Sequence, residues 1–285
     1  SYFELQPRFY LESNVNKRSQ VHFSYSRTAQ FVHAVPNNSL GIPLDVWMPS
    51  DRQIRPMSSE QFEIGWKLFT KKKYSFQIDL YQRQMFNVLS YQYSVYDLVA
   101  DWTDAVNAGR GRSYGVDFMA QKRSGRLNGW IKYTLSRSER RFAHIRNGDW
   151  FPFKYDRRHD FSLVAQYLFN KKWNIGLNCV YASGHYITVP EAQYVIEING
   201  NSTLISNFGA LNNLKVPDYF RADIGLNYSI VRKKTSQSLS LKVYNLTNRQ
   251  NVYYVSSRIN ENGVASLAPI SLFPLLPTIN YAISF

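Results

Sequence analysis

Long apolar runs and cysteines are nearly absent from this chain of 285 residues. No segment approaches the roughly eighteen consecutive apolar residues of a membrane-spanning helix, so a helical membrane protein is excluded. The only cysteine is Cys179, which excludes an intrachain disulfide and says little about the cellular compartment. The stretch that follows Ser1 does not have the charged and apolar regions of a secretory signal peptide.

Acidic residues are also scarce relative to basic ones, and the formal net charge is +14. Nucleic acid is the usual partner of so basic a chain. Here, however, the positive charge lies in short turns and long loops, and no nucleic-acid-binding motif accompanies it. We therefore expect no nucleic-acid partner. The basic turns are Lys17-Arg18, Lys71–Lys73, Lys171-Lys172 and Arg232–Lys234.

Aromatic residues, by contrast, are abundant, with 21 Tyr, 18 Phe and 6 Trp. This exceeds what one ordinary core needs, whereas the interfacial girdles of a transmembrane β-barrel would use the surplus. A mean hydropathy of −0.37 does not oppose a barrel, because half of each strand would face a polar lumen. The alternative is an aromatic-rich soluble β-protein, such as a sandwich or a glycan-binding module.

The segment from Asp218 to the C-terminus shows a clear period of two. Such alternation predicts strands with one apolar and one polar face. The residues expected to face lipid are Phe220, Ile224, Leu226 and Tyr228, and those expected to face a lumen are Arg221, Asp223 and Asn227. The chain then ends on a strand with the same spacing, and its apolar members are Ile279, Tyr281, Ile283 and Phe285. An unpaired apolar edge strand invites aggregation, whereas a closed barrel pairs it.

The predicted elements follow one rhythm: strand, short turn, strand, long loop. This unit recurs five times, with one strand left over. Short turns on one side and long loops on the other are typical of outer-membrane barrels, and strands of about ten residues fit a tilted bilayer crossing. A β-propeller would instead show blade-length repeats. The sequence thus predicts an all-β fold, a transmembrane antiparallel β-barrel with about eleven strands.

The odd number of predicted strands has a further meaning. Bacterial single-chain barrels have an even number of strands. An odd number, a start within a strand and the missing signal peptide together predict that this chain is the C-terminal part of a larger barrel.

A series of short motifs runs along the chain at barrel-like spacing. They are Phe23–Thr28 (FSYSRT), Pro43–Ser50 (PLDVWMPS), Gly111–Phe118 (GRSYGVDF), Tyr133–Ser138 (YTLSRS), Asp156–Asp160 (DRRHD), Val243–Arg249 (VYNLTNR) and the Phe285 ending. Together they resemble the barrels of TonB-dependent outer-membrane receptors. The likeness covers essentially the whole chain and is greatest to the Bacteroidetes-type receptors that carry a carboxypeptidase-regulatory-like domain before the plug.

The resemblance implies a 22-stranded barrel of which residues 1–285 are the C-terminal half, with the plug and N-terminal regions outside this chain. It implies a multi-pass protein of the outer membrane of a Gram-negative bacterium, surrounded by outer-membrane lipid and lipopolysaccharide. Its partners would be the N-terminal half of the same barrel with its plug, TonB through the missing N-terminal region, and a surface lipoprotein. In such receptors the assembly machinery reads the aromatic end of the final strand, here Tyr281, Ile283 and Phe285.

The function that the resemblance implies is active import of a nutrient ligand (a siderophore, a glycan, a peptide or similar) with energy coupled through TonB. Enzymatic activity is not expected. The alternative is a non-transporting outer-membrane scaffold barrel that holds partner proteins or surface lipoproteins. Sequence upstream of Ser1 separates the two hypotheses, because a plug with a TonB-contacting segment favours import.

The candidate ligand-contacting residues lie in the predicted long loops. Arginine binds carboxylate and phosphate through paired hydrogen bonds, and aromatic faces stack on sugar rings and flat ligands. The residues chosen on these grounds are Trp102, Asp104, Arg146, Trp150 and Arg157. In the competing interpretation the arginines pair with lipopolysaccharide phosphates or with local acids, and the aromatics pack loops together. The nearby acids are Glu139, Asp149, Asp156 and Asp160.

The histidines do not show a metal-binding spacing. They are His22, His33, His144, His159 and His185. We therefore expect neither a metal site nor a cofactor. Asp156 and His159-Asp160 lie close to serines, as in hydrolytic outer-membrane enzymes, but the sequence does not identify a nucleophile by geometry, so no catalytic residue is assigned.

Overall fold

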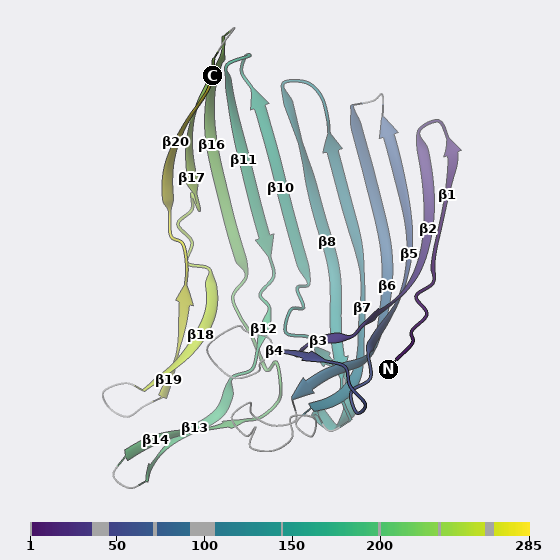
Figure 1. The fold of residues 1–285 in the computed structure, drawn as a ribbon. Helices are drawn as coiled ribbons and strands as arrows, with labels where there is room; N and C mark the ends of the chain where they lie inside the picture. Colours follow the sequence, from purple (N-terminus) through teal and green to yellow (C-terminus); the bar gives the residue numbers. More distant parts are fainter. Residues whose placement is uncertain are drawn as a thin grey trace.

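The computed structural model describes residues 2–35, 46–70, 73–91, 106–143, 145–198, 201–232, 235–259 and 265–285, most of which belong to one antiparallel β-sheet. Eleven strands cross the sheet in chain order, each paired with the next (Figure 1). They are β1 (Arg8–Asn16), β2 (Ser19–Gln30), β5 (Met57–Thr70), β6 (Tyr74–Tyr91), β7 (Val106–Lys122), β8 (Leu127–Arg141), β10 (His159–Leu168), β11 (Trp173–Ala182), β16 (Tyr219–Val231), β17 (Ser236–Tyr244) and β20 (Leu276–Ser284). This order confirms the predicted antiparallel all-β fold.

Short turns and long connections occupy opposite rims of the sheet, as the sequence predicts. The short turns lie at the upper rim in Figure 1, which we call the turn rim, and the long connections lie at the loop rim. The long connections carry the hairpins β3–β4 (Val32–Val35, Val46–Pro49), β13–β14 (Pro190–Ile198, Asn201–Phe208) and β18–β19 (Val252–Ile259, Ala265–Ser271), the pair β12–β15 (Tyr186–Ile187, Leu214–Lys215), the short β9 (Phe151–Pro152) on β8, and the 3-10 turn η2 (Arg146–Gly148). Among the described residues no helix is long and apolar enough to cross a membrane.

The strand register gives the sheet one apolar and one polar face. One row of paired residues contains Leu11, Phe23, Ile64, Leu80, Val116 and Leu135. The next row contains Glu12, His22, Gly65, Asp79, Asp117 and Thr134. Because successive residues of a strand point to opposite sides, these rows lie on opposite faces. Ile64 and Leu80 are 57% and 50% exposed, as expected for side chains that meet lipid rather than protein.

β16 confirms the register predicted from its alternation. Leu226 pairs with Ile175 of β11 and Leu241 of β17, so it belongs to an apolar row. Its neighbour Asn227 donates from Nδ2 to Oδ1 of Asn174 at 2.9 Å on the polar face. The predicted division of this strand into two faces therefore holds.

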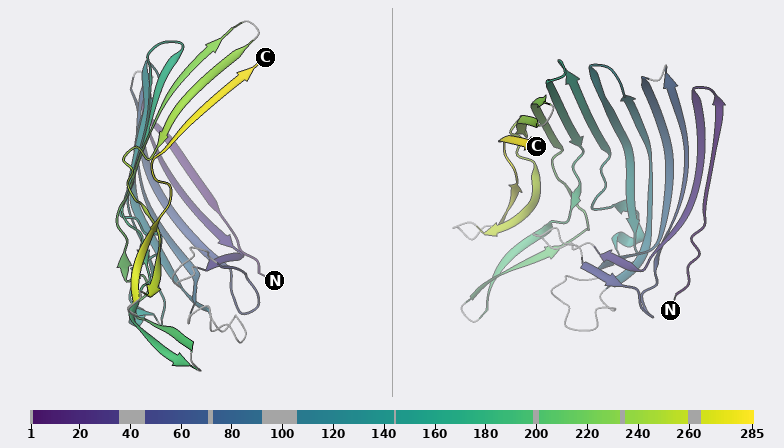
Figure 2. Two further views of the ribbon diagram at one scale, coloured as in Figure 1. Left: turned by 90° about the vertical axis from the view of Figure 1, so that its left-hand side faces the viewer. Right: turned by 45° about the horizontal axis from the view of Figure 1, so that its top comes forward.

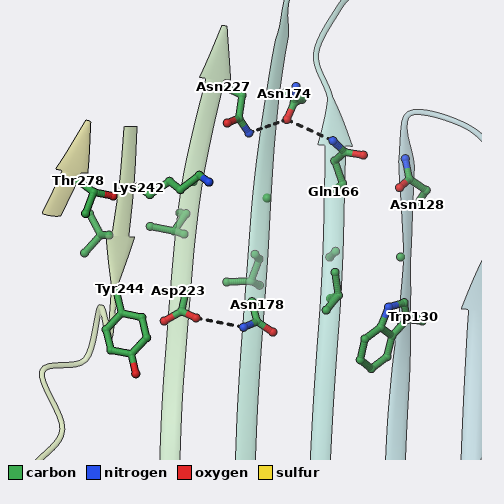
Figure 3. A pocket seen from close by; sticks show the side chains of 18 of the residues that line it. Asn128, Trp130, Gln166, Asn174, Asn178, Asp223, Asn227, Lys242, Tyr244 and Thr278 are labelled. Carbon is green, nitrogen blue, oxygen red and sulfur yellow. Dashed lines mark hydrogen bonds between the residues drawn. The ribbon is translucent and has the colours of Figure 1, made fainter. Parts of the chain in front are cut away.

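The sheet curves strongly, and its polar face is the concave one. Figure 2 shows the curvature from the side, and Figure 3 shows the polar side chains from the concave side. β1 and β20 form the two edges, which lie apart, and every residue of both strands is exposed. The described strands therefore form an open trough, as one part of a larger barrel would.

Alternation in the sequence predicts one strand from Tyr2 to Glu12 and another that fades after Phe86, and both boundaries differ in the structure for local reasons. β1 begins at Arg8 rather than Tyr2, because Pro7 has no N–H to donate to the ladder. The carbonyl of Pro7 still accepts the N–H of Arg27 at 2.9 Å. β6 continues past its expected end at Phe86, because a bulge at Asn87 absorbs one residue and the pairing resumes at the next position. Asn87 has a φ of +56°, which asparagine tolerates better than most residues.

Buried apolar side chains concentrate at the loop rim. One cluster consists of Val35, Met48, Ile54 and Leu89, and a second consists of Met85, Val88, Phe142 and Phe151. Both form where the long connections fold onto the ends of the central strands. The loop rim is therefore a packed layer with its own core.

Candidate functional site

An ionic cluster lies at the loop rim, on the paired ends of β7 and β8. Arg112 Nε donates to Oε2 of Glu139 at 2.7 Å, and Arg137 Nη2 lies 2.6 Å from Oε1 of the same residue. The Glu139 side chain is 2% exposed. Arg112 and Glu139 are direct cross-strand partners, and Arg137 lies two residues away on the same face. One charge-assisted hydrogen bond from Arg112 and one ion pair with Arg137 thus offset the burial of one carboxylate.

The connection from β8 to β10 folds over this cluster. The Arg112 guanidinium lies 4.3 Å from the ring centre of Trp150. Its Nε–H group donates to Glu139, and its flat face contacts the indole ring. The Arg146 guanidinium lies 5.7 Å from the ring centre of Phe151, a nearly fully buried residue. Arginine and aromatic side chains therefore interleave along this rim.

The predicted ligand-contacting residues separate into three groups. Arg146 and Trp150 lie in the connection between β8 and β10, where Arg146 stacks on Phe151 and Trp150 stacks on Arg112 of β7. Arg157 lies further along the chain, where its carbonyl accepts the hydroxyl of Ser136 at 3.1 Å. Trp102 and Asp104 lie outside the described residues. Arg146 and Trp150 thus share one connection at the loop rim, and contact of any of the five with a ligand stays a prediction.

Two carboxylates pin the loop rim to the strand ends. Asp156 Oδ1 accepts the backbone N–H of Ser138 at 2.5 Å, and burial raises the pKa of Asp156. Asp218 accepts the hydroxyl of Tyr181 at 2.7 Å and the N–H of Gly184 at 2.9 Å. These two hydrogen bonds lower the pKa of Asp218, because they favour its charged form. The segments before β10 and β16 are thereby fixed relative to the sheet.

Two histidines at the loop rim are disposed to stay neutral. Burial lowers the pKa of His33, whose Nε2 lies 3.1 Å from the Ser50 hydroxyl. Burial, followed by the charges of Arg157 and Lys154, lowers the pKa of His185. Within the described residues neither histidine belongs to a group of three potential metal ligands.

The concave face holds a groove of about 1010 Å³ that extends from β7 to β20 and is lined by polar side chains and by apolar ones such as Trp130 and Val164. Hydrogen bonds join its side chains across the strands (Figure 3). Asn174 Oδ1 accepts from Gln166 Nε2 at 3.2 Å and from Asn227 Nδ2 at 2.9 Å, and Asn178 Nδ2 donates to Asp223 at 3.0 Å. Carboxamides both donate and accept hydrogen bonds, so this surface suits a polypeptide or a polar solute.

A compact triad lies on the same concave face, on β2, β5 and β6. It consists of His22, Glu63 and Asp79. Sequence reasoning missed both the triad and the groove. The polar member of each alternating pair was visible in the sequence, but the cross-strand register that brings distant residues together was not.

The geometry defines a class of protein. An antiparallel trough with an apolar outer face, a polar inner face and long loops on one rim is part of a transmembrane β-barrel. Residues 1–246 match the family model described as the β-barrel of TonB-dependent receptor-like proteins. The chain therefore belongs to the TonB-dependent receptor β-barrel family. The members of this family are transport receptors rather than enzymes.

Solved receptors share this fold. The chain is similar to the ferric yersiniabactin uptake receptor FyuA from Yersinia pestis, at 14% identity and a TM-score of 0.63 over 98% of this chain and 37% of that one. It is also similar to the FrpB iron transporter from Neisseria meningitidis, at 13% identity and a TM-score of 0.62 over 98% and 39%. It is likewise similar to the pyoverdine receptor FpvA from Pseudomonas aeruginosa PAO1, at 14% identity and a TM-score of 0.61 over 98% of this chain and 35% of that one. No curated protein matches the chain. The chain thus spans less than two fifths of the length of these receptors.

Proposed function

We propose that this chain is the C-terminal half of the 22-stranded barrel of an outer-membrane import receptor whose energy is coupled through TonB. The open trough supports this best, because its eleven strands end in two unpaired edges, β1 and β20. The N-terminal half of the same barrel would pair with both edges and leave no exposed backbone. The apolar face would then contact lipid of the outer membrane of a Gram-negative bacterium, and the loop rim would meet lipopolysaccharide.

The concave groove would face the plug. Its carboxamides offer the plug backbone many neutral hydrogen bonds, each worth a net of about 0.5–1.5 kcal/mol. A set of such bonds holds the plug in place, yet none is strong enough to prevent its displacement. TonB, acting through the N-terminal region outside this chain, would supply the force that displaces it.

The ligand would enter at the loop rim. FyuA is described as a ferric yersiniabactin uptake receptor, FrpB as an iron transporter and FpvA as a pyoverdine receptor. The basic, aromatic-lined rim of this chain suits an anionic chelate. A glycan or a peptide would use the aromatic faces instead, and a surface lipoprotein would assist its capture. The proposed ligand contacts are Trp102, Asp104, Arg146, Trp150 and Arg157.

Uptake by cells that carry the full-length receptor tests the proposal. A strain without the receptor, and the same strain complemented with it, are supplied with labelled ferric siderophores, peptides or oligosaccharides. We expect uptake of one class, restored by complementation and abolished when TonB is inactivated. A receptor that assembles normally but imports none of these classes in a TonB-dependent way contradicts import and favours the scaffold alternative.

A further inference from the structure

Three potential metal-ligand groups converge on the concave face of β2, β5 and β6. Nε2 of His22 lies 3.3 Å from Oε1 of Glu63 and 3.4 Å from Oδ1 of Asp79. All three donor atoms lie within 4.8 Å of one another. We propose that His22, Glu63 and Asp79 bind a divalent transition-metal ion, with Zn²⁺ as the best fit.

Hydrogen bonding alone does not satisfy these three groups. One imidazole nitrogen carries at most one hydrogen, so Nε2 of His22, which lies in hydrogen-bond geometry with Glu63, cannot also donate to Asp79. The contact from His22 to Asp79 does not have hydrogen-bond geometry, so Oδ1 of Asp79 is a buried oxygen without a donor. A buried polar atom of this kind points to a missing water or ion. A cation between the three groups satisfies all of them, because it accepts electron pairs from the nitrogen and both oxygens.

Two glutamine side chains orient the carboxylates of Asp79 and Glu63, because they bond the carboxylate oxygens that do not contact His22. Gln77 Nε2 donates to Oδ2 of Asp79 at 2.8 Å, and Gln61 Nε2 lies 3.2 Å from Oε2 of Glu63. Each amide occupies one carboxylate oxygen and leaves the other directed at the imidazole. Metal-ligating carboxylates are held in the same way by hydrogen bonds outside the coordination sphere.

Gly65 and Tyr10 shape the space around the triad. Gly65 lies between His22 and Asp79 in the strand register. A Cβ atom there would be 2.1 Å from Cε1 of His22 and 2.2 Å from Oδ1 of Asp79, so a larger residue would push the groups apart. The ring of Tyr10 on β1 stacks on the imidazole, with centres 5.8 Å apart, and limits its rotation.

The donor set indicates which ion would bind. One imidazole and two carboxylates, without a thiolate, suit Zn²⁺ and neighbouring divalent metals. Tetrahedral Zn²⁺ with bonds of about 2.0–2.1 Å keeps its ligand atoms about 3.3–3.4 Å apart, which matches the two separations from His22 Nε2. Three protein ligands leave the fourth position for water or for a group that approaches from the lumen.

Zinc binding by the purified full-length receptor in detergent tests this site. Chelator-treated receptor is titrated with ZnCl₂, and bound metal is measured by elemental analysis and calorimetry. We expect a site whose affinity falls about tenfold or more in His22→Ala and Asp79→Asn. Glu60→Gln is the matched control, because it removes a carboxylate from the same strand outside the triad. Co²⁺ at the wild-type site should show the visible absorption of tetrahedral coordination, and His22→Ala should remove it.

The heat-modifiable electrophoretic mobility of folded barrels verifies that each variant is assembled. If Asp79→Asn does not assemble, Gln77→Ala keeps all three ligands and should still weaken zinc binding, by about tenfold. Wild-type receptor that binds no Zn²⁺, or variants that bind it as tightly as wild type, would overturn the proposal. None of these measurements depends on transport, so their outcome is independent of the function proposed above.

Discussion

Single charged residues hold the loop rim together. Glu139 is almost completely buried, accepts a hydrogen bond from Arg112 and forms an ion pair with Arg137, and the two arginine side chains are 40% and 48% exposed. Arg112 in turn stacks on Trp150. If the carboxylate lost its charge, the two guanidinium groups would lie near each other without an anion between them. Arg112 would then lose the contact that fixes its orientation against the Trp150 ring.

Glu139→Gln should therefore loosen the connection between residues 142 and 158. A hydrogen bond to a charged group contributes about 1.5–3 kcal/mol, and the solvent exposure of both arginines lowers this to about 1 kcal/mol for local opening. Limited proteolysis of the intact receptor should cut this connection roughly five times faster than in wild type. The exposed Asp149→Asn in the same connection should leave the rate unchanged. Equal cleavage of wild type and Glu139→Gln would mean that the ionic cluster does not stabilise the rim.

Strands were largely predictable from the sequence, because a period of two is a local property of the chain. Exceptions arose where one residue changed the backbone, as Pro7 did at the start of β1 and Asn87 did within β6. Cross-strand register is not local. For that reason alternation assigned His22 and Asp79 to polar faces but did not show that they meet.

The face assignment of β16 makes a direct prediction. Leu226 lies on the apolar face near the middle of the strand, and Asn227 lies on the concave face. An arginine on the lipid face near the bilayer midplane costs about 2–4 kcal/mol, whereas the lumenal face tolerates charge. Leu226→Arg should thus reduce the amount of folded barrel much more than Asn227→Arg, as measured by heat-modifiable mobility in membrane fractions. Equal losses would place the register one residue away.

For the molecule as a whole, the sequence predicted the antiparallel all-β fold, and the structure confirms it. That the chain is one half of a larger barrel stays a prediction. The candidate site was less predictable. Loop composition pointed to Arg146 and Trp150, but only the fold showed that each already stacks on a neighbouring side chain. A residue that packs within a loop can still present its other face to a ligand, so assembly and ligand capture must be measured separately.

Variants in the C-terminal strand and in the loop rim allow assembly and ligand capture to be measured separately. Tyr281 and Ile283 lie on one face of the edge strand β20, and Phe285 follows them at 96% exposure. If this terminus guides assembly, deletion of Phe285 should lower the amount of folded receptor and leave the ligand affinity of the surviving molecules unchanged. The double variant Arg146→Ala, Trp150→Ala should do the opposite, because a loop tip contributes little to barrel stability.

Quantitative blotting of heat-modified receptor and ligand binding to isolated outer membranes measure the two effects in the same cells. Phe3→Ala, which removes an exposed aromatic side chain outside β1, is the control for loss of the terminal aromatic residue. If the double variant assembles and imports normally, Arg146 and Trp150 serve only to pack the rim, and ligand contact would have to come from the stretch that contains Trp102 and Asp104. If deletion of Phe285 leaves the amount of folded receptor unchanged, the terminal aromatic residue has no role in assembly.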